Sequence, residues 1–124
     1  MKIQLQSLFF LFALLQVTLS TPVGVKLPTE DDFYTYSGDL DKIKPGTILK
    51  TRNTPSRIRS IYFPVNFKNS WQMLVRSTDS HDNPNVFVTT VIEPYNGNSS
   101  KLLAYQTAED SSSPDCAPSY AFLY

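Results

Sequence analysis

The chain has 124 residues, enough for one domain. Its 11 lysines and arginines balance its 11 aspartates and glutamates, so the formal net charge is zero. This balance excludes the usual basic nucleic-acid binder, which needs a positive surface against the phosphates. The apolar share of 41% is too high for a generally disordered protein. With one cysteine and one histidine, we expect no disulfide within the chain, no metal site and no cofactor.

The first twenty residues have the layout of a secretory signal peptide. Lys2 supplies a positive charge, Leu8–Leu15 is entirely apolar, and Ser20 is a small residue before the expected cleavage site. The apolar run is shorter than the ~20 residues that cross a bilayer, which argues against a membrane anchor. A buried amphipathic helix fits less well, because the run is apolar all round. We therefore predict a signal peptide at 1–20 and a secreted, extracellular protein.

The rest of the chain is interpreted as a tail at 21–30 and a β-rich domain portion at 31–124. In Ser70–Ser77 the apolar residues stand at nearly every second position, which is typical of a strand with one buried face. Val86–Ile92 is dense in β-branched residues, which also favours a strand. The polar stretch 78–85 between them predicts a hairpin-type loop.

Weaker signals complete the predicted order of elements. They are a turn at Lys44–Gly46, a strand at Thr47–Lys50, a loop at Thr51–Pro64, a turn at Asn96–Asn98, a strand at Leu102–Thr107, a loop at Glu109–Pro114 and a helix that starts at Pro118. The loop arginines Arg52, Arg57 and Arg59 are interpreted as solvated charges, with contact to lipid headgroups as the alternative. The last four residues are apolar or aromatic, so we expect the chain to be cut inside a helix.

No complete catalytic constellation is present in the sequence. A serine-hydrolase elbow needs Gly-x-Ser-x-Gly, and no two of the four glycines stand four apart. His81 is interpreted as an exposed turn histidine rather than a general base, because nothing near it in the sequence would orient it. Cys116 lacks a neighbouring positive charge that would activate it as a nucleophile. Asn98 begins an Asn-Ser-Ser sequon and is predicted to carry a glycan on a surface loop.

Several short motifs, taken together in their order, resemble the fungal secretory lipases, the Candida-type secreted triacylglycerol lipases. The segments that carry the resemblance are Asp31–Tyr34, Pro45–Lys50, Trp71–Asp79, Val88–Pro94 and Ala104–Tyr120. They cover essentially the whole chain from Asp31. The most specific is the last, where Tyr-Gln-x-x-Glu-Asp is followed by Asp-Cys-Ala-Pro-Ser-Tyr.

This resemblance implies an α/β fold class, with the chain as the N-terminal, β-rich, truncated fragment of an α/β-hydrolase. The nucleophile elbow and the triad residues would lie downstream, so we expect this chain alone to be inactive. Asp110 matches the position whose backbone N–H contributes to the oxyanion hole. Cys116 matches a cysteine whose disulfide partner is absent here.

The same resemblance implies a substrate for the intact family. That substrate would be triacylglycerol or another lipid ester, met in transient contact with a lipid interface. The alternative function is a small secreted β-rich binding protein derived from a lipase. The alternative is disfavoured because its apolar strands would lack helical cover.

Overall fold

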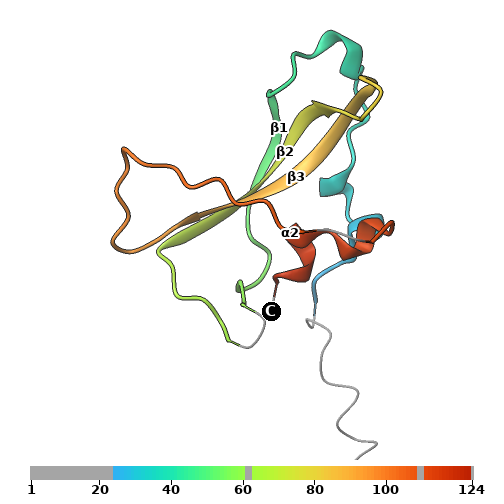
Figure 1. The fold of residues 1–124 in the computed structure, drawn as a ribbon. Helices are drawn as coiled ribbons and strands as arrows, with labels where there is room; N and C mark the ends of the chain where they lie inside the picture. The colour runs from blue at the N-terminus through green and yellow to red at the C-terminus, as the bar shows by residue number, and fades with distance from the viewer. Residues whose placement is uncertain (1–23, 61–62, 109–110, 124) are drawn as a thin grey trace, which may run out of the picture.

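The computed structural model of the protein describes residues 24–60, 63–108 and 111–123. The expected signal peptide at 1–20 lies outside these residues. Within them, the centre of the fold is a three-stranded antiparallel sheet in the order β1-β2-β3 (Figure 1). The strands are β1 (Ile48–Asn53), β2 (Asn69–Thr78) and β3 (Pro84–Glu93). The predicted strands at 70–77 and 86–92 are therefore confirmed, each extended by one or two residues at both ends.

Short helices flank this sheet. Four are 3-10 turns and one is a single α-helical turn: η1 (Pro28–Glu30), η2 (Asp32–Tyr34), η3 (Leu40–Lys42), η4 (Pro114–Cys116) and α2 (Pro118–Ala121). The predicted helix start at Pro118 is confirmed. Figure 1 shows η4 and α2 beside the N-terminal 3-10 turns, although these segments are far apart in the sequence. None of the helices in the described ranges is long and apolar enough to span a membrane.

A tight turn joins β2 to β3. The Asp79 carboxylate accepts hydrogen bonds from the backbone N–H groups of His81, at 2.8 Å, and Asn83, at 2.9 Å. Asp82 adopts a left-handed backbone with a φ of 62°, a conformation that aspartate tolerates better than most residues. The hydrogen bond from the Asn83 side chain and those from the backbone lower the pKa of Asp79. The predicted hairpin loop is thus confirmed, and local hydrogen bonds to one carboxylate explain its shape.

β1 is longer than the sequence suggested, because its pairing with β2 continues to Asn53. The prediction of a loop from Thr51 was therefore wrong for the first three residues. The ladder contains a bulge, since Ile48 pairs with Val75 and Lys50 pairs with the adjacent Leu74. One extra residue in β1 thus places Ile48 and Lys50 on opposite faces of the sheet.

The two faces of the sheet differ in how they are covered. On one face of β2 four successive side chains are buried, and these residues are Ser70, Gln72, Leu74 and Arg76. On the other face, Trp71, Met73 and Val75 are only half-buried. Their neighbours Ile48 and Phe87 are 52% and 49% exposed. In β2 the covered face is thus largely polar, and the open face is apolar.

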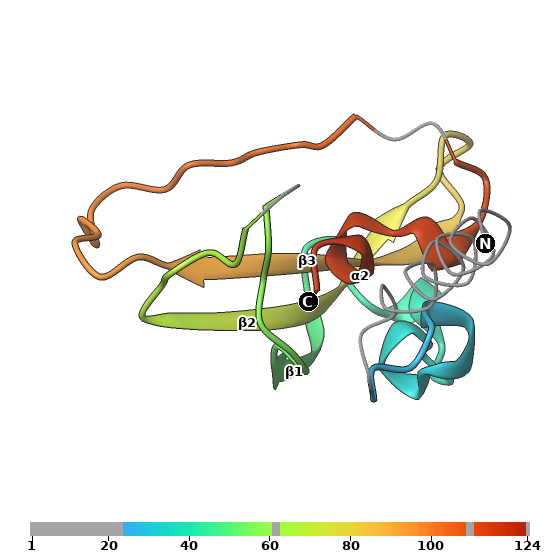
Figure 2. The same ribbon diagram turned by 90° about the horizontal axis from the view of Figure 1, so that it is seen from below.

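The predicted strand at Leu102–Thr107 is wrong. The segment forms no strand, and its large apolar side chains are almost fully exposed: Leu102 by 91%, Leu103 by 89% and Tyr105 by 80%. A strand needs a neighbouring edge for its backbone hydrogen bonds, and no segment within the described ranges pairs with this one. Figure 2 shows it running apart from the sheet after the turn that follows β3. The strand-forming composition of Leu102–Thr107 is therefore not sufficient, because a strand also needs a neighbouring strand to pair with.

We predict that a protease finds this exposed segment first. At low chymotrypsin concentration, the first cut within residues 24–123 should follow Leu102, Leu103 or Tyr105, because cleavage requires an extended, accessible backbone. Mass spectrometry of the early fragments identifies the site. First cleavage inside the β2–β3 hairpin would show that Leu102–Thr107 is protected and contradict the structure.

Candidate functional site

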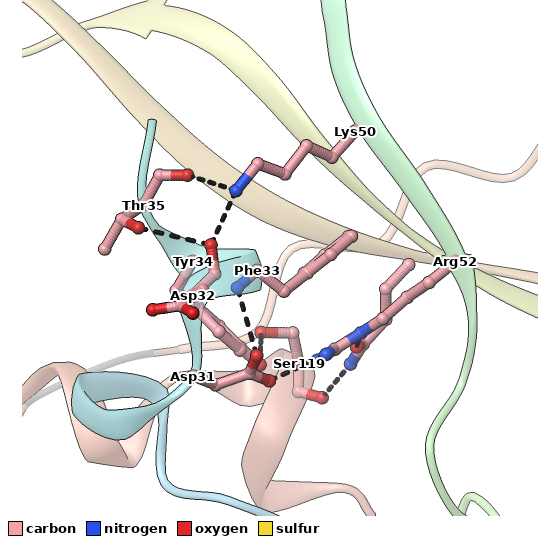
Figure 3. A network of polar contacts seen from close by, with 9 residues as sticks. Asp31, Asp32, Phe33, Tyr34, Thr35, Lys50, Arg52 and Ser119 are labelled. Atoms are coloured by element: carbon pink, nitrogen blue, oxygen red, sulfur yellow. Dashed lines mark hydrogen bonds and ion pairs between the residues drawn. The ribbon is translucent and has the colours of Figure 1, made fainter. Parts of the chain in front are cut away.

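The most connected polar group on the covered face is the Arg52 guanidinium of β1 (Figure 3). Its Nη1 atom lies 2.7 Å from the Asp31 carboxylate, and its Nε atom donates to Gln72 Oε1 at 2.9 Å. The guanidinium carbon also lies 4.0 Å from the centre of the Phe33 ring and 5.8 Å from that of Tyr34. Arg52 therefore combines an ion pair, a hydrogen bond and cation–π contacts, as the planar guanidinium allows.

This position corrects the interpretation of Arg52 as a solvated loop charge. Its side chain is 24% exposed, and that of Asp31 is 14% exposed. Arg52 lies in a strand and not in a loop. Its pairing with Gln72 in the ladder therefore sets the face of the sheet from which its side chain projects. Of the other two arginines in that interpretation, Arg57 is exposed and Arg59 is half-buried.

Gln72 extends the network to the C-terminal segment. Its Nε2 atom donates to the backbone carbonyl of Ser119 in α2 at 2.6 Å. The hydroxyl of Tyr34 lies 3.0 Å from Ser119 Oγ and forms a second hydrogen bond to the same residue. We call these five residues, Asp31, Tyr34, Arg52, Gln72 and Ser119, the Arg52 network. It joins the N-terminal turns, two strands and α2.

Two further contacts hold the same parts together at the edge of the network. The Lys50 ammonium donates to the backbone carbonyls of Asp32, at 2.6 Å, and Thr35, at 2.7 Å. Thr29 donates to the Asp115 carboxylate through its backbone N–H, at 3.0 Å, and its hydroxyl, at 2.9 Å. The N-terminal turns are thus bound to β1 and to η4 by charge-assisted hydrogen bonds.

Two pKa values respond to this arrangement. Burial raises the pKa of Asp31, but the hydrogen bond from the Phe33 N–H and the contacts with Arg52 outweigh it, so the net pKa is lowered. Burial raises the pKa of Tyr34. Asp31 is therefore a carboxylate and Tyr34 a neutral phenol at neutral pH. No buried side-chain nitrogen or oxygen in the described ranges lacks a hydrogen-bond partner. The network consequently holds segments together rather than offering a reactive group.

A serine and a histidine do meet elsewhere, in the β2–β3 turn. Ser80 Oγ lies 3.3 Å from His81 Nδ1, and both residues are exposed. The Asp79 carboxylate accepts from the backbone N–H of His81. A nucleophile and base need a third group to orient the ring and a site sheltered from water. The prediction of His81 as an exposed turn histidine is therefore confirmed.

The structure describes two of the three predicted site residues, Asn98 and Cys116. Asp110, the expected oxyanion donor, lies outside the described residues. Asn98 is exposed, and its side-chain Oδ1 accepts from the Ser100 N–H at 2.9 Å, in a local turn. Cys116 is a free, exposed thiol in η4. Within the described ranges, no group of three or more histidine, cysteine, aspartate or glutamate residues could hold a metal ion.

Comparison with known proteins identifies the relatives of this chain as lipases of Candida albicans. The chain is 49% identical to Lipase 2 over 116 residues, which is 94% of this chain and 25% of that lipase. It is 50% identical to Lipase 1 over 112 residues, 90% of this chain and 24% of that lipase. It is 45% identical to Lipase 10 over 120 residues, 97% of this chain and 26% of that lipase.

These matches confirm the resemblance to Candida lipases seen in the sequence motifs. The chain spans about a quarter of the length of the curated relatives it matches. No protein-family model and no solved structure matches it. The relatives imply an α/β-hydrolase family, and a small antiparallel sheet with few helices is consistent with a β-rich portion of such a fold.

We predict that the charge of Asp31 stabilises the fold in a pH-dependent way. Asp31→Asn keeps an acceptor for the Phe33 N–H but removes the charge facing Arg52, at a cost on the order of 1–3 kcal/mol at pH 7. Because the folded pKa is lowered from 3.8, this stabilisation is present above pH ~4 and is lost as the pH falls through the folded pKa. Denaturant titrations followed by the fluorescence of Trp71 measure it. A gap between the two proteins that stays constant from pH 7 to pH 3 would refute the charge effect.

Proposed function

We propose that this chain is a portion of a lipase that acts on lipid esters. The observation that carries the proposal is the 45–50% identity to Candida albicans lipases over 90–97% of the chain. Similarity of that extent supports a common fold and a common role for the matched portion. No observation favours the alternative, a small secreted β-rich binding protein derived from a lipase.

Within such a lipase, the chain would supply a donor to the oxyanion hole and not the nucleophile. The proposed donor is the backbone N–H of Asp110, directed at the oxyanion that develops when an ester carbonyl is attacked. One such donor contributes about 3 kcal/mol to transition-state stabilisation in a complete site. The serine, the acid and the histidine of the triad would come from the parts of a lipase that this chain does not match.

We further propose that the chain is secreted, with cleavage after Ser20 and a glycan on Asn98. The exposed position of Asn98 supports access by the glycosylating enzyme. The exposed thiol of Cys116 supports a disulfide with a cysteine elsewhere in an intact lipase, since secreted proteins pair their cysteines.

The central experiment compares the chain alone with a fusion of residues 21–124 to the remaining three quarters of Lipase 2. The chain alone should not hydrolyse p-nitrophenyl esters above a denatured control, because it lacks an elbow serine. The fusion should. In the fusion, Asp110→Ala retains the backbone N–H, whereas Asp110→Pro removes it and should lower kcat by roughly 100-fold more. Rates are compared at equal folded protein, because proline also restricts the backbone.

Each part of this experiment can fail separately. Turnover by the chain alone that a serine-directed phosphonate abolishes would reveal an unrecognised nucleophile. An inactive fusion would contradict the lipase role. Equal rates for the Ala and Pro variants would remove Asp110 from the oxyanion hole and leave the lipase role intact.

Secretion and glycosylation are tested by expressing residues 1–124 in yeast. We expect protein in the medium that starts at Thr21 and shifts to lower mass with an N-glycosidase. Asn98→Gln should abolish the shift, while Ser100→Thr, which preserves the sequon, should retain it. Retention of the chain inside the cell, or a mass shift that persists in Asn98→Gln, would disprove these assignments.

A further inference from the structure

The outer edge of β3 is the longest unpaired strand edge in the described part of the chain. β2 lies between its two neighbours, so β1 and β3 are the edge strands of the sheet (Figure 1). β3 has ten residues, whereas β1 has six. An edge strand presents backbone N–H and C=O groups on its outer side that another strand can bind. Whether such pairing occurs depends on what blocks each edge.

The ladder between β2 and β3 shows which backbone groups of β3 face outward. Arg76 lies opposite Val86 in this ladder. The Arg76 N–H donates to the Thr47 carbonyl at 2.9 Å, and its own carbonyl accepts from the Gly46 N–H at 2.8 Å, both on the side of β1. Arg76 and Val86 therefore share no hydrogen bond, and Val86 turns its N–H and C=O outward. Hydrogen-bonded pairs alternate with pairs that are not bonded in antiparallel strands. The residues that also face outward by this alternation are Val88, Thr90 and Ile92.

Most of these outward N–H groups have no acceptor among the described residues. The Val86 N–H is the exception, because the Asn85 side chain accepts it at 2.8 Å. The N–H groups of Val88, Thr90 and Ile92 form no hydrogen bond to other segments in the described ranges. Exposed backbone groups of this kind are satisfied by water, which the backbone of a partner strand can replace. The outer edge of β3 thus offers a row of available donors and acceptors.

The two edges differ in the features that prevent strands from pairing. Such features include bulges, charged side chains and short strands. β1 has all three, since it bulges between Ile48 and Lys50 and carries the charges of Lys50 and Arg52 within six residues. β3 has none of them, because Pro84–Ile92 is uncharged and pairs with β2 without a shift in register. The β3 edge is therefore open to pairing, and the β1 edge is protected against it.

We propose that two copies of this chain pair through their β3 edges in an antiparallel, twofold-symmetric arrangement. The strand is complementary to itself when Thr89 lies opposite Thr89 of the second copy. Each outward-facing residue then lies opposite an outward-facing residue of the other copy, so that their backbone groups bond. Pro84 and Pro94, which have no N–H, also lie opposite each other in this register and end the ladder at both sides. This inference does not depend on the proposed lipase function.

The side chains that this register brings together also fit one another. Phe87 and Ile92 are 49% and 43% exposed in the single chain. The register places Phe87 opposite Val91 of the second copy, and it places Ile92 opposite Val86. Pairs of aromatic and β-branched residues stabilise antiparallel strands, as do pairs of threonines such as Thr89 with its symmetry mate. Pairing would thus cover the most exposed apolar side chains of β3.

The protected β1 edge limits the assembly to a dimer. Each copy has one open edge, and a twofold pair uses both of them, so no open edge remains for a third copy. The two sheets join into one continuous antiparallel sheet, with the apolar faces of both copies on the same side. An interface made by one strand edge is small, so we expect a dissociation constant on the order of 10 µM.

Charge placed on the twofold axis tests this arrangement. Thr89→Lys and Thr89→Glu each place two like charges opposite each other in the dimer, which is destabilising. A mixture of the two variants places opposite charges there instead. The matched control is Thr51→Lys in β1, which introduces the same charge beside Met73 on the same open face of the sheet.

Sedimentation of the full chain expressed in yeast, from about 1 to about 100 µM, measures the dissociation constant. The unsubstituted chain and Thr51→Lys should form dimers of similar affinity. Each Thr89 variant alone should have a dissociation constant at least about tenfold higher, and the mixture should return to within about threefold of the unsubstituted chain. Residues 1–20 are common to all variants, so association through them would persist in Thr89→Lys.

Hydrogen exchange of the unsubstituted chain locates the contact without any substitution. The amides of Val88, Thr90 and Ile92 should exchange more slowly as the protein concentration rises, because dimer formation gives them acceptors. A chain that stays monomeric over the whole range would overturn the proposal. So would a dimer that Thr89→Lys leaves intact, or one that the mixture does not restore. Slow exchange of these amides in a monomer would show that another segment of the same chain, such as Leu102–Thr107, covers the edge, and would also overturn it.

Discussion

The structure depends on how the positive charge of Arg52 is compensated on the covered face of the sheet. A charge that is largely withdrawn from water is costly unless it is paired and hydrogen-bonded. Here Asp31 supplies the opposite charge, Gln72 an acceptor and Phe33 the face of an aromatic ring. These partners come from separate parts of the chain. The contacts that compensate the charge of Arg52 therefore also determine how those parts pack together.

This arrangement explains how the described part of the chain holds its segments in order with so few buried apolar residues. In the described ranges the buried hydrophobic residues are Ile58, Leu74 and Leu123. Hydrogen bonds have directional requirements that apolar contacts lack, so a polar covered face favours one arrangement of segments over other compact ones. The apolar side chains on the other face of β2 remain half-exposed, which is consistent with a β-rich fragment of an α/β-hydrolase.

How much of this was predictable from the sequence depended on the distance between interacting residues. The β2–β3 hairpin was predicted well because its alternation and turn residues are local. Arg52 was misinterpreted because its partners lie 20 and 21 residues away, where no local pattern reveals them. The alternation of apolar residues gave no sign that the polar side chain of Gln72 is buried and can accept from Arg52. The strand at Leu102–Thr107 was wrong for the same reason, since composition does not show whether a pairing edge is present.

The bulge in β1 has a consequence for how this strand tolerates changes in length. Ile48 and Lys50 face opposite sides although they are two positions apart, because Leu49 is the extra residue of the ladder. Loss of Leu49 alone would make the ladder regular and leave Lys50 and Arg52 on the covered face. Loss of the residue between Lys50 and Arg52 would turn one of these two charged side chains to the open face of the sheet. A single-residue deletion in β1 should thus be tolerated at Leu49 and selected against between Lys50 and Arg52.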